Sequence, residues 1–182
     1  MGILAPIRRL TPAEYLAWEA EQPDRNELVD GVPYSLAGAG RLHEEVALAL
    51  AALLWTHVRG GACRVYKSDR RLQVGDDFFY PDIVVTCRAE DRQTDGAIKS
   101  PTTIIEVLSR PTAAYDRGEK RERYATLSNL ETYVVVDPES RSIERYDRTG
   151  AWTRHVLAPQ DTLVIEAIGF SADPAEIFST LA

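Results

Sequence analysis

The sequence is short of cysteine and has no long apolar run, and each of these shortages excludes a class of protein. Two cysteines in 182 residues cannot build a disulfide framework or a four-thiolate zinc site. We expect Cys63 and Cys87 to be buried free thiols, with a bond between them as the open alternative. No apolar run approaches the roughly 18 residues of a membrane helix, and the first residues lack the order of a signal peptide. We therefore expect a reduced, cytoplasmic protein without a membrane anchor.

Positive charge is also scarce. The chain has 21 Lys and Arg residues against 28 Asp and Glu residues, a net charge of −7. This balance excludes a globally basic protein that coats nucleic acid. Any phosphate-binding surface must be local, and a bound metal would help it to tolerate anions. A hydrophobic fraction of 45% and a charged fraction of 27% are typical of a globular domain and exclude disordered and collagen-like chains.

Hydrophobic periodicity and turn signals predict one α/β domain over residues 1–182, with a mixed β-sheet flanked by helices. Asp30 and Gly31 form a strong hairpin signal. The helix predicted over 42–58 is apolar on both sides, with Leu48 and Trp55 opposite the main stripe, so we expect it to be largely buried. The other predicted helices cover 11–21, 117–127 and 173–178, and Thr11 with Glu14 forms a capping-box pattern at the start of the first of these. The predicted strands cover 26–29, 32–36, 63–67, 71–74, 79–86, 102–108, 132–136, 142–146, 152–157 and 162–165.

Two acidic residues fall on predicted buried strands. Asp82 follows Pro81, and proline marks the start of a strand, so Asp82 should lie at that start; a turn or cap role is the alternative. Strand alternation places Glu106 on the same face as Ile104 and Leu108. A carboxylate among apolar side chains needs a cation, a proton or water, and the alternative for Glu106 is a solvated strand end. Paired across neighbouring strands, Asp82 and Glu106 would hold a hard cation, most naturally Mg²⁺.

The segment 115–124 carries cations and carboxylates in near balance. This pattern is typical of a solvated helix face with pairs at spacings of three and four residues. Because the segment follows the Glu106 strand after a short break, one of its cations could instead lie over the end of that strand. Helical spacing would turn Lys120 and Tyr124 toward the sheet together.

These motifs together resemble the Uma-type restriction endonuclease family, a group within the PD-(D/E)xK nuclease superfamily. The resemblance covers roughly residues 11–178, and the order and spacing of the motifs make it specific. It is carried by Glu27 with 28–31, His43, Pro81-Asp82, 105–109, Tyr115-Asp116 with Lys120 and Tyr124, and 131–138.

The resemblance implies a restriction-endonuclease-like core over about 25–140, followed by a C-terminal hairpin and short helix over 141–182. It implies DNA cleavage with Mg²⁺ or Mn²⁺ and assigns Asp82 and Glu106 as metal ligands. The superfamily pattern has lysine two residues after the glutamate, where this chain has Leu108, so the resemblance assigns the catalytic lysine to Lys120. Glu27 and His43 match auxiliary positions, as a further ligand or as groups that orient the ligands. A core histidine is the alternative for His43.

The predicted chemistry suits a phosphodiester. A divalent cation lowers the pKa of its bound water and stabilises charge in the transition state. Lys120 would orient or deprotonate the attacking water, or neutralise developing charge. Two alternatives stay open: a catalytically inactive nuclease-fold module that binds DNA or protein, and a metal-dependent hydrolase that acts on another substrate.

The expected contact with DNA is local, and scattered surface charge is the alternative. Single copies of such small nuclease cores cut one strand at a time, so cleavage of both strands would imply a homodimer. The basic residues expected to follow the phosphates are Arg64, Lys67, Arg70 and Arg71, together with Arg8 and Arg9.

Overall fold

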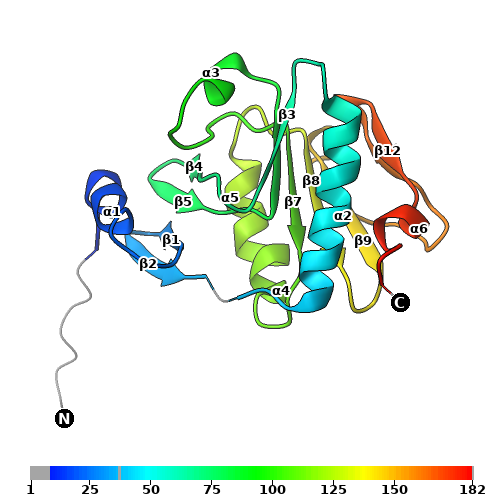
Figure 1. Ribbon diagram of the computed structural model, residues 1–182, viewed down its shortest axis with the longest axis horizontal. Coiled ribbons are helices and arrows are strands. Elements are labelled where there is room, and N and C mark those ends of the chain that lie inside the picture. The colour runs from blue at the N-terminus through cyan, green and yellow to red at the C-terminus, as the bar shows by residue number, and fades with distance from the viewer. Residues whose placement is uncertain (1–8, 37, 182) are drawn as a thin grey trace, which may run out of the picture.

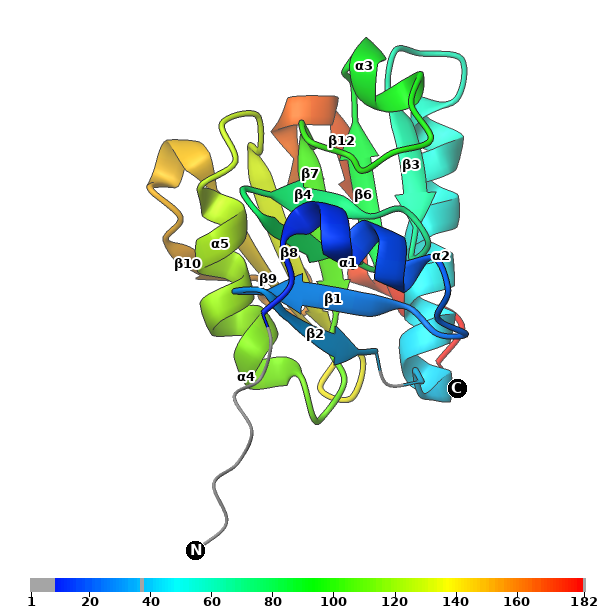
Figure 2. The same ribbon diagram turned by 90° about the vertical axis from the view of Figure 1, so that its left-hand side faces the viewer.

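The computed structural model describes residues 9–36 and 38–181, and its centre is a six-stranded mixed β-sheet with helices on both faces (Figure 1). The long helix α2 (Arg41–Val58) covers one face together with the C-terminal elements. The other face carries helix α5 (Arg121–Ala125) and a smaller four-stranded sheet. Figure 2 shows α2 and α5 on opposite sides of the large sheet. The predicted mixed sheet flanked by helices is therefore confirmed.

The remaining elements are short. The helices are α1 (Pro12–Glu19), α3 (Ala89–Arg92), α4 (Ala113–Tyr115) and α6 (Pro174–Ile177), with a π-helical turn η1 (Asp116–Lys120) and the 3₁₀ turns η2 (Arg148–Gly150) and η3 (Glu166–Ile168). The strands are β1 (Asn26–Val29), β2 (Val32–Ser35), β3 (Arg64–Lys67), β4 (Leu72–Val74), β5 (Asp77–Phe79), β6 (Ile83–Thr86), β7 (Thr103–Val107), β8 (Thr132–Asp137), β9 (Ser142–Asp147), β10 (Arg154–Val156), β11 (Leu163–Ile165) and β12 (Phe170–Ala172). The turn η1 joins α4 to α5, so the helical segment begins earlier than predicted.

The large sheet has the strand order β10-β9-β8-β7-β6-β3. Strands β7 and β8 are parallel, and the other neighbours are antiparallel. Ile83, the first residue of β6, pairs with Ile105. Since β6 and β7 run in opposite directions, the start of β6 lies beside the end of β7, and Asp82 lies beside Glu106. The small sheet has the order β2-β1-β5-β4, and β11 pairs with β12.

Alternate residues of the large sheet enter two separate cores. Ile105 of β7 packs in the core beneath α2, with Leu50. Ile104 and Leu108 belong to the core on the opposite face, with Tyr124 of α5. This is the division of faces that strand alternation predicts, and it turns Glu106 toward α5.

Local sequence explains the N-terminal elements. Thr11 caps α1 in a reciprocal capping box with Glu14, as the sequence pattern predicts. The β1–β2 turn holds Asp30 and Gly31 at φ values of 50° and 78°, the conformation that favours Asp-Gly in a two-residue hairpin. A Cβ at Gly31 would lie 2.9 Å from Cβ of Arg9, so the turn also needs glycine for space. This hairpin carries Glu27 on β1.

Two expectations about element packing were wrong. Helix α2 is not largely buried: the side chains of Leu48 and Trp55 are 63% and 56% exposed, because only one face of the helix lies against the sheet. The strand predicted over 79–86 is two strands, β5 in the small sheet and β6 in the large one. The break falls around Pro81, which has no N–H to donate to a ladder, and there the chain passes from one sheet to the other.

The expectation of free thiols was also wrong, because Cys63 and Cys87 form a disulfide. Arg64 pairs with Thr86 across β3 and β6, so the cysteines just beyond that pair face each other. Disulfides are characteristic of oxidising compartments, and the argument from reduced thiols to a cytoplasmic location no longer stands; that location remains a prediction. In the described part of the chain, no helix is both long and apolar enough to cross a membrane.

Candidate active site

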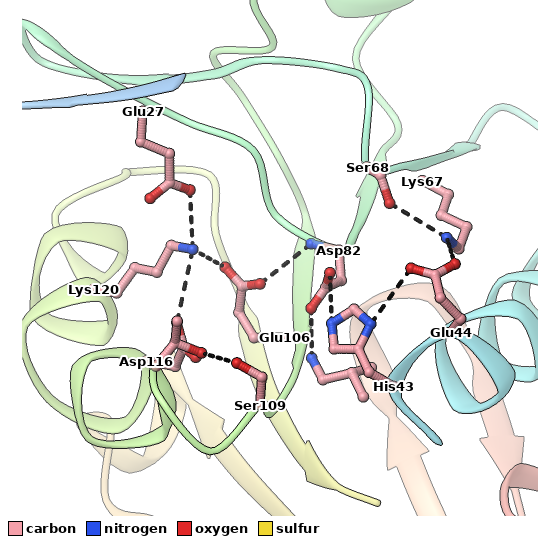
Figure 3. A network of polar contacts seen from close by, with 12 residues as sticks. Glu27, His43, Glu44, Lys67, Ser68, Asp82, Glu106, Ser109, Asp116 and Lys120 are labelled. Carbon is pink, nitrogen blue, oxygen red and sulfur yellow. Dashed lines mark hydrogen bonds and ion pairs between the residues drawn. The ribbon is translucent and has the colours of Figure 1, made fainter. Parts of the chain in front are cut away.

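Two carboxylates meet where β6 begins beside the end of β7 (Figure 3). The backbone N–H of Asp82 donates to Oε2 of Glu106 over 3.2 Å. The backbone N–H of Val107 donates to Oδ2 of Asp82 over 2.8 Å. The backbone at the start of β6 thus binds the side chain of Glu106, and the backbone at the end of β7 binds the side chain of Asp82. The structure brings the two predicted metal ligands together.

Lys120 lies among three carboxylates (Figure 3). Its Nζ is 3.0 Å from Oε1 of Glu106, 3.0 Å from Oε1 of Glu27 and 3.7 Å from Oδ1 of Asp116, and all four side chains are buried. Burial alone would lower the pKa of Lys120, but the three carboxylates outweigh it and raise that pKa well above its ordinary value. The ammonium is therefore charged at neutral pH.

The π-helical turn η1 helps to place Lys120. Such turns are rare and frequently occur at functional sites. Asp116, Lys120 and Tyr124 follow one another at spacings of four residues, and all three are buried. The hydroxyl of Tyr124 donates to Oε1 of Glu106 over 3.0 Å. Burial raises the pKa of Tyr124 well above its ordinary value, so the hydroxyl keeps its proton. One side of this helical segment therefore supplies both an ammonium and a hydroxyl to the same carboxylate.

Glu27 enters the site from the small sheet. Its Oε1 accepts a hydrogen bond from the backbone N–H of Tyr80 over 3.0 Å and also contacts Lys120. Tyr80 lies two residues before Asp82. Glu27 therefore links the chain just before Asp82 to the helical segment that carries Lys120.

His43 contacts the site from the first turn of α2. Its Nε2 is 3.1 Å from Oδ1 of Asp82. Its Nδ1 is buried, makes no hydrogen bond to a described residue, and lies 3.6 Å from Glu44. Burial alone would lower the pKa of His43, but its hydrogen bond to Asp82 and the charge of that carboxylate raise it above the ordinary value. His43 thus faces Asp82 rather than the apolar core under α2.

The residues predicted to be metal ligands, catalytic or auxiliary all line one cleft of about 790 Å³: Glu27, His43, Asp82, Glu106 and Lys120. Its lining also includes Arg41 on α2 and Arg110 on the loop after β7. These two side chains are 69% and 82% exposed and form ion pairs with Glu45 and Glu139. The buried carboxylates therefore open onto a cleft with exposed cations around it.

The donor atoms suit a hard divalent cation held by few protein ligands. A carboxylate has about four lone-pair sites, and Asp82 uses one for His43 and one for the N–H of Val107, which leaves acceptor capacity toward a cation. Mg²⁺ takes one or two carboxylates and keeps several waters. Within residues 9–36 and 38–181, no group of three or more His, Cys, Asp or Glu side chains is arranged to hold a metal, which does not suit a structural zinc site.

The basic residues expected to contact DNA are dispersed. Lys67 lies near the cleft, with its Nζ 3.1 Å from Oε2 of Glu44. Arg64 lies at the opposite end of β3, where it pairs with Thr86 and donates to the carbonyl of Gly61.

The other members of that set make internal contacts. Arg71 forms an ion pair over 2.9 Å with the buried Glu19. Arg70 donates to the carbonyl of Thr94 and lies over the ring of Tyr66. Arg9 donates to the carbonyl of Asp30. Arg8 is outside the described residues.

Sequence reasoning gave no role to several residues of this cleft, among them Asp116, Arg41 and Arg110. Asp116 was quoted only as part of the family resemblance, although its spacing of four residues from Lys120 would have placed both on one helix face. Arg41 and Arg110 had no comparable signal, because only the folded chain brings the start of α2 near the loop after β7.

A solved structure shares this fold. The crystal structure of "a putative nuclease belonging to DUF820 from Anabaena variabilis ATCC 29413" matches with a TM-score of 0.81, covers 95% of this chain and 99% of that one, and is 16% identical in sequence. At that identity the likeness shows the fold alone. That structure therefore shares the mixed α/β fold of this chain.

Sequence comparison identifies the family. In Synechocystis sp. (strain ATCC 27184 / PCC 6803 / Kazusa), uncharacterized protein slr1290 is 35% identical over 182 residues, 98% of this chain and 96% of its own. Uncharacterized protein sll1609 of the same organism is 31% identical over 155 residues, 82% of this chain and 87% of its own. The Uma2 family, described as "Putative restriction endonuclease", matches residues 12–175. The chain belongs to the Uma2 family, and the resemblance inferred from the motifs is confirmed.

Proposed function

We propose that this protein is an endonuclease that hydrolyses DNA phosphodiester bonds with the help of a divalent cation, Mg²⁺ or Mn²⁺. One observation carries the proposal: Asp82, Glu106 and Lys120 come from separate elements and meet in one cleft. The family description supports a nucleic-acid substrate.

Asp82 and Glu106 would hold the cation at the cleft. When bound, a divalent cation there supplies charge for the phosphate oxygens and makes a water nucleophilic at neutral pH. Hydrolysis adds the oxygen of a water molecule to phosphorus and breaks the bond to the leaving sugar oxygen, which takes up a proton that the water gives up. The backbone hydrogen bonds between the two strand ends support this role, because they fix the direction of both carboxylates before substrate arrives.

Lys120 would act as a fixed positive charge rather than as a base. Its raised pKa keeps the ammonium protonated at neutral pH, so it has no free lone pair with which to take a proton from water. An ammonium beside Glu106 can stabilise negative charge that develops on the phosphate. Of the three roles considered for this lysine, neutralising developing charge is the one that its surroundings favour.

Glu27 and His43 would act as positioning residues. Glu27 contacts Lys120 from the small sheet and limits where the ammonium can lie. His43 contacts one oxygen of Asp82, while the backbone of Val107 holds the other oxygen. Groups that orient metal ligands in this way commonly tune both affinity and activity.

We propose that DNA enters over the cations around the cleft, Arg41, Lys67 and Arg110. Among the described residues of the basic set expected from the sequence, Lys67 lies near the site. Arg9, Arg64, Arg70 and Arg71 remain candidates for a more distant contact with the phosphates, in which each would have to give up its contacts within the chain to bind DNA.

A cleavage assay tests the proposal. Supercoiled plasmid should be nicked in Mg²⁺ and left intact in excess chelator, and Asp82→Asn and Glu106→Gln should remove the activity. Glu139→Gln, which changes an exposed carboxylate of the same cleft, is the matched control and should remain active.

The outcome of the assay also separates the alternatives. Binding of plasmid without nicking would favour an inactive DNA-binding module. Neither binding nor nicking, with metal-dependent turnover of other phosphoesters in a substrate panel, would favour a hydrolase of another class. Either result would overturn the proposed function.

A further inference from the structure

Helix α2 carries a second stripe of residues that faces away from the sheet. Leu48 and Trp55 are 63% and 56% exposed, whereas Leu50 and Leu54 on the inner side are buried. In Figure 2, α2 lies at one edge of the molecule with the large sheet on its inner side. We call this face the outer stripe, and its members follow one another at spacings of four, three, four, three and four residues: Arg41, Glu45, Leu48, Ala52, Trp55 and Arg59.

Such a stripe differs from the scattered apolar residues of an ordinary surface. Single exposed apolar side chains are normal. Here a leucine and a tryptophan stand two helical turns apart on one line, with the small Ala52 between them. This spacing is typical of helix–helix packing, and tryptophan is enriched in protein interfaces. A helix of this length extends roughly 27 Å at about 1.5 Å per residue, which is long enough for a packed helix pair.

The charges of the outer stripe indicate which partner fits. Glu45 lies seven residues before Ala52, and Arg59 lies seven residues after it. If two copies of α2 cross antiparallel at Ala52, Glu45 of each copy meets Arg59 of the partner subunit. A parallel pair would instead oppose like charges. The stripe is therefore complementary to itself about a two-fold axis, as an isologous dimer interface requires.

Both charged groups already have contacts within the chain, and both can still reach a partner. Glu45 contacts Arg41 over 2.9 Å through one helical turn, an arrangement that contributes little on its own. The guanidinium of Arg59 lies 5.8 Å from the ring centre of Trp55. This places the charge beside the apolar part of the stripe, where a partner helix would pack.

We propose that the outer stripe of α2 is the interface of a homodimer, in which two α2 helices pack antiparallel with Ala52 at the crossing. Each Trp55 then packs against Leu48 of the partner subunit. The proposal is independent of the proposed nuclease activity, because its test measures molecular mass.

Sedimentation equilibrium tests the proposal on the full chain, over concentrations that bracket a micromolar dissociation constant. The mass of the wild-type protein should rise with concentration from the 20.3 kDa of one chain toward twice that value. Trp55→Glu should raise the dissociation constant at least about tenfold, the scale of a lost interface anchor. Val156→Glu alters an equally exposed apolar residue on β10 and should leave the mass unchanged.

A charge exchange tests the antiparallel arrangement. Glu45→Arg alone and Arg59→Glu alone should each weaken the dimer, because each opposes like charges across the interface. The double variant restores opposite charges and should recover dimerisation. Circular dichroism and thermal unfolding of each variant check that the fold is kept.

Each of the following results would overturn the proposal. A wild-type protein that stays monomeric at every concentration removes the dimer. If Trp55→Glu dimerises as well as the wild type does, the interface lies elsewhere. The same follows if Val156→Glu weakens the dimer as much as Trp55→Glu does. A double charge variant as weak as the two single variants rules out the antiparallel pairing.

Discussion

Glu106 and Glu144 lie in one row of the large sheet, because Val135 of β8 pairs with Glu106 on one side and with Glu144 on the other. Each carboxylate receives a cation from the same helical segment. Lys120 lies 3.0 Å from Glu106, and Nε of Arg117 donates to Oε1 of Glu144 over 2.7 Å. The segment that holds Lys120 is therefore attached to the sheet in the candidate site and again two strands away, at β9.

The second attachment should contribute measurably to stability. Glu144 is buried and accepts hydrogen bonds from Arg117, Arg154 and Tyr146. Glu144→Gln should lower the free energy of unfolding by about 1.5–3 kcal/mol, the range for hydrogen bonds to charged groups, as measured by denaturant unfolding at pH 7. Glu139→Gln is the control and should change it little, because exposed ion pairs contribute little.

The same variant should show a defined pH dependence. Burial would raise the pKa of Glu144, but its hydrogen bonds to Arg154, Arg117 and Tyr146 outweigh burial and lower that pKa to about 2 from 4.5. The stabilisation is complete above pH 4.5 and is lost as the pH falls toward 2. The difference in unfolding free energy between wild type and Glu144→Gln should therefore shrink over that interval. A constant difference would contradict the assigned pKa.

Lys120→Met tests the lysine directly. The rate of single-turnover plasmid cleavage in Mg²⁺, normalised to folded protein, should fall at least roughly 10²-fold, the scale of a lost charge-stabilising group. Arg121→Met is the matched control, because Arg121 is adjacent in sequence and lies over the ring of Tyr146 instead. A near wild-type rate for Lys120→Met, or a larger loss for Arg121→Met, would remove Lys120 from the mechanism.

Lys120→Met should also destabilise the fold. Without the ammonium, Glu27, Glu106 and Asp116 remain buried near one another, and a buried charge that loses its partner costs about 3–5 kcal/mol. The loss should diminish at acid pH, because protonated carboxylates need no cation. Denaturant unfolding of wild type and Lys120→Met at neutral and acid pH measures this difference. If wild type and variant were equally stable at both pH values, that result would argue against the buried cluster.

The salt dependence of DNA binding should identify the cations that contact phosphate. Replacing Arg41 and Arg110 together by alanine should flatten the slope of log affinity against log salt by about 0.9 for each phosphate that is no longer neutralised. Replacing Arg70 and Arg71 should change the slope less, because both are partly buried and neither lines the cleft, whereas Arg41 and Arg110 are exposed around it. A larger change in slope for the Arg70 and Arg71 replacement than for the Arg41 and Arg110 replacement would instead identify the basic stretch expected from the sequence as the DNA surface.

The disulfide should stabilise the protein without serving the site. Cys63 and Cys87 lie beyond the Arg64–Thr86 end of β3 and β6, and Asp82 precedes the opposite end of β6. Replacing both cysteines by serine should lower the free energy of unfolding by about 2–4 kcal/mol and leave the cleavage rate unchanged. Reductant should reproduce the loss in wild type and have no effect on the variant. A stability unaffected by either change would contradict a formed disulfide.

Local patterns predicted much of the fold. Thr11 with Glu14 marked the start of α1, Asp30-Gly31 marked the hairpin, and alternation along β7 gave the face of Glu106. These signals act between residues that are close in sequence. They also placed Lys120 and Tyr124 on the side of the helix that faces the sheet.

The features that escaped prediction depend on contacts between distant segments. The pairing of Cys63 with Cys87 requires the register of β3 against β6, and the exposure of Trp55 depends on what lies over α2. The helix α3 and the strand β12 were not predicted, because three or four residues carry too little periodicity. The position of Glu27 beside Lys120 likewise follows from how the small sheet packs on the large one.

A crystal soaked with Mn²⁺ provides the most direct measurement of the site, because anomalous scattering locates the metal itself without a known DNA sequence. We predict a manganese peak in contact with carboxylate oxygens of both Asp82 and Glu106, and its absence in crystals of Asp82→Asn. No peak at these residues in the wild-type crystal, or a peak that persists in Asp82→Asn, would contradict metal binding by this pair.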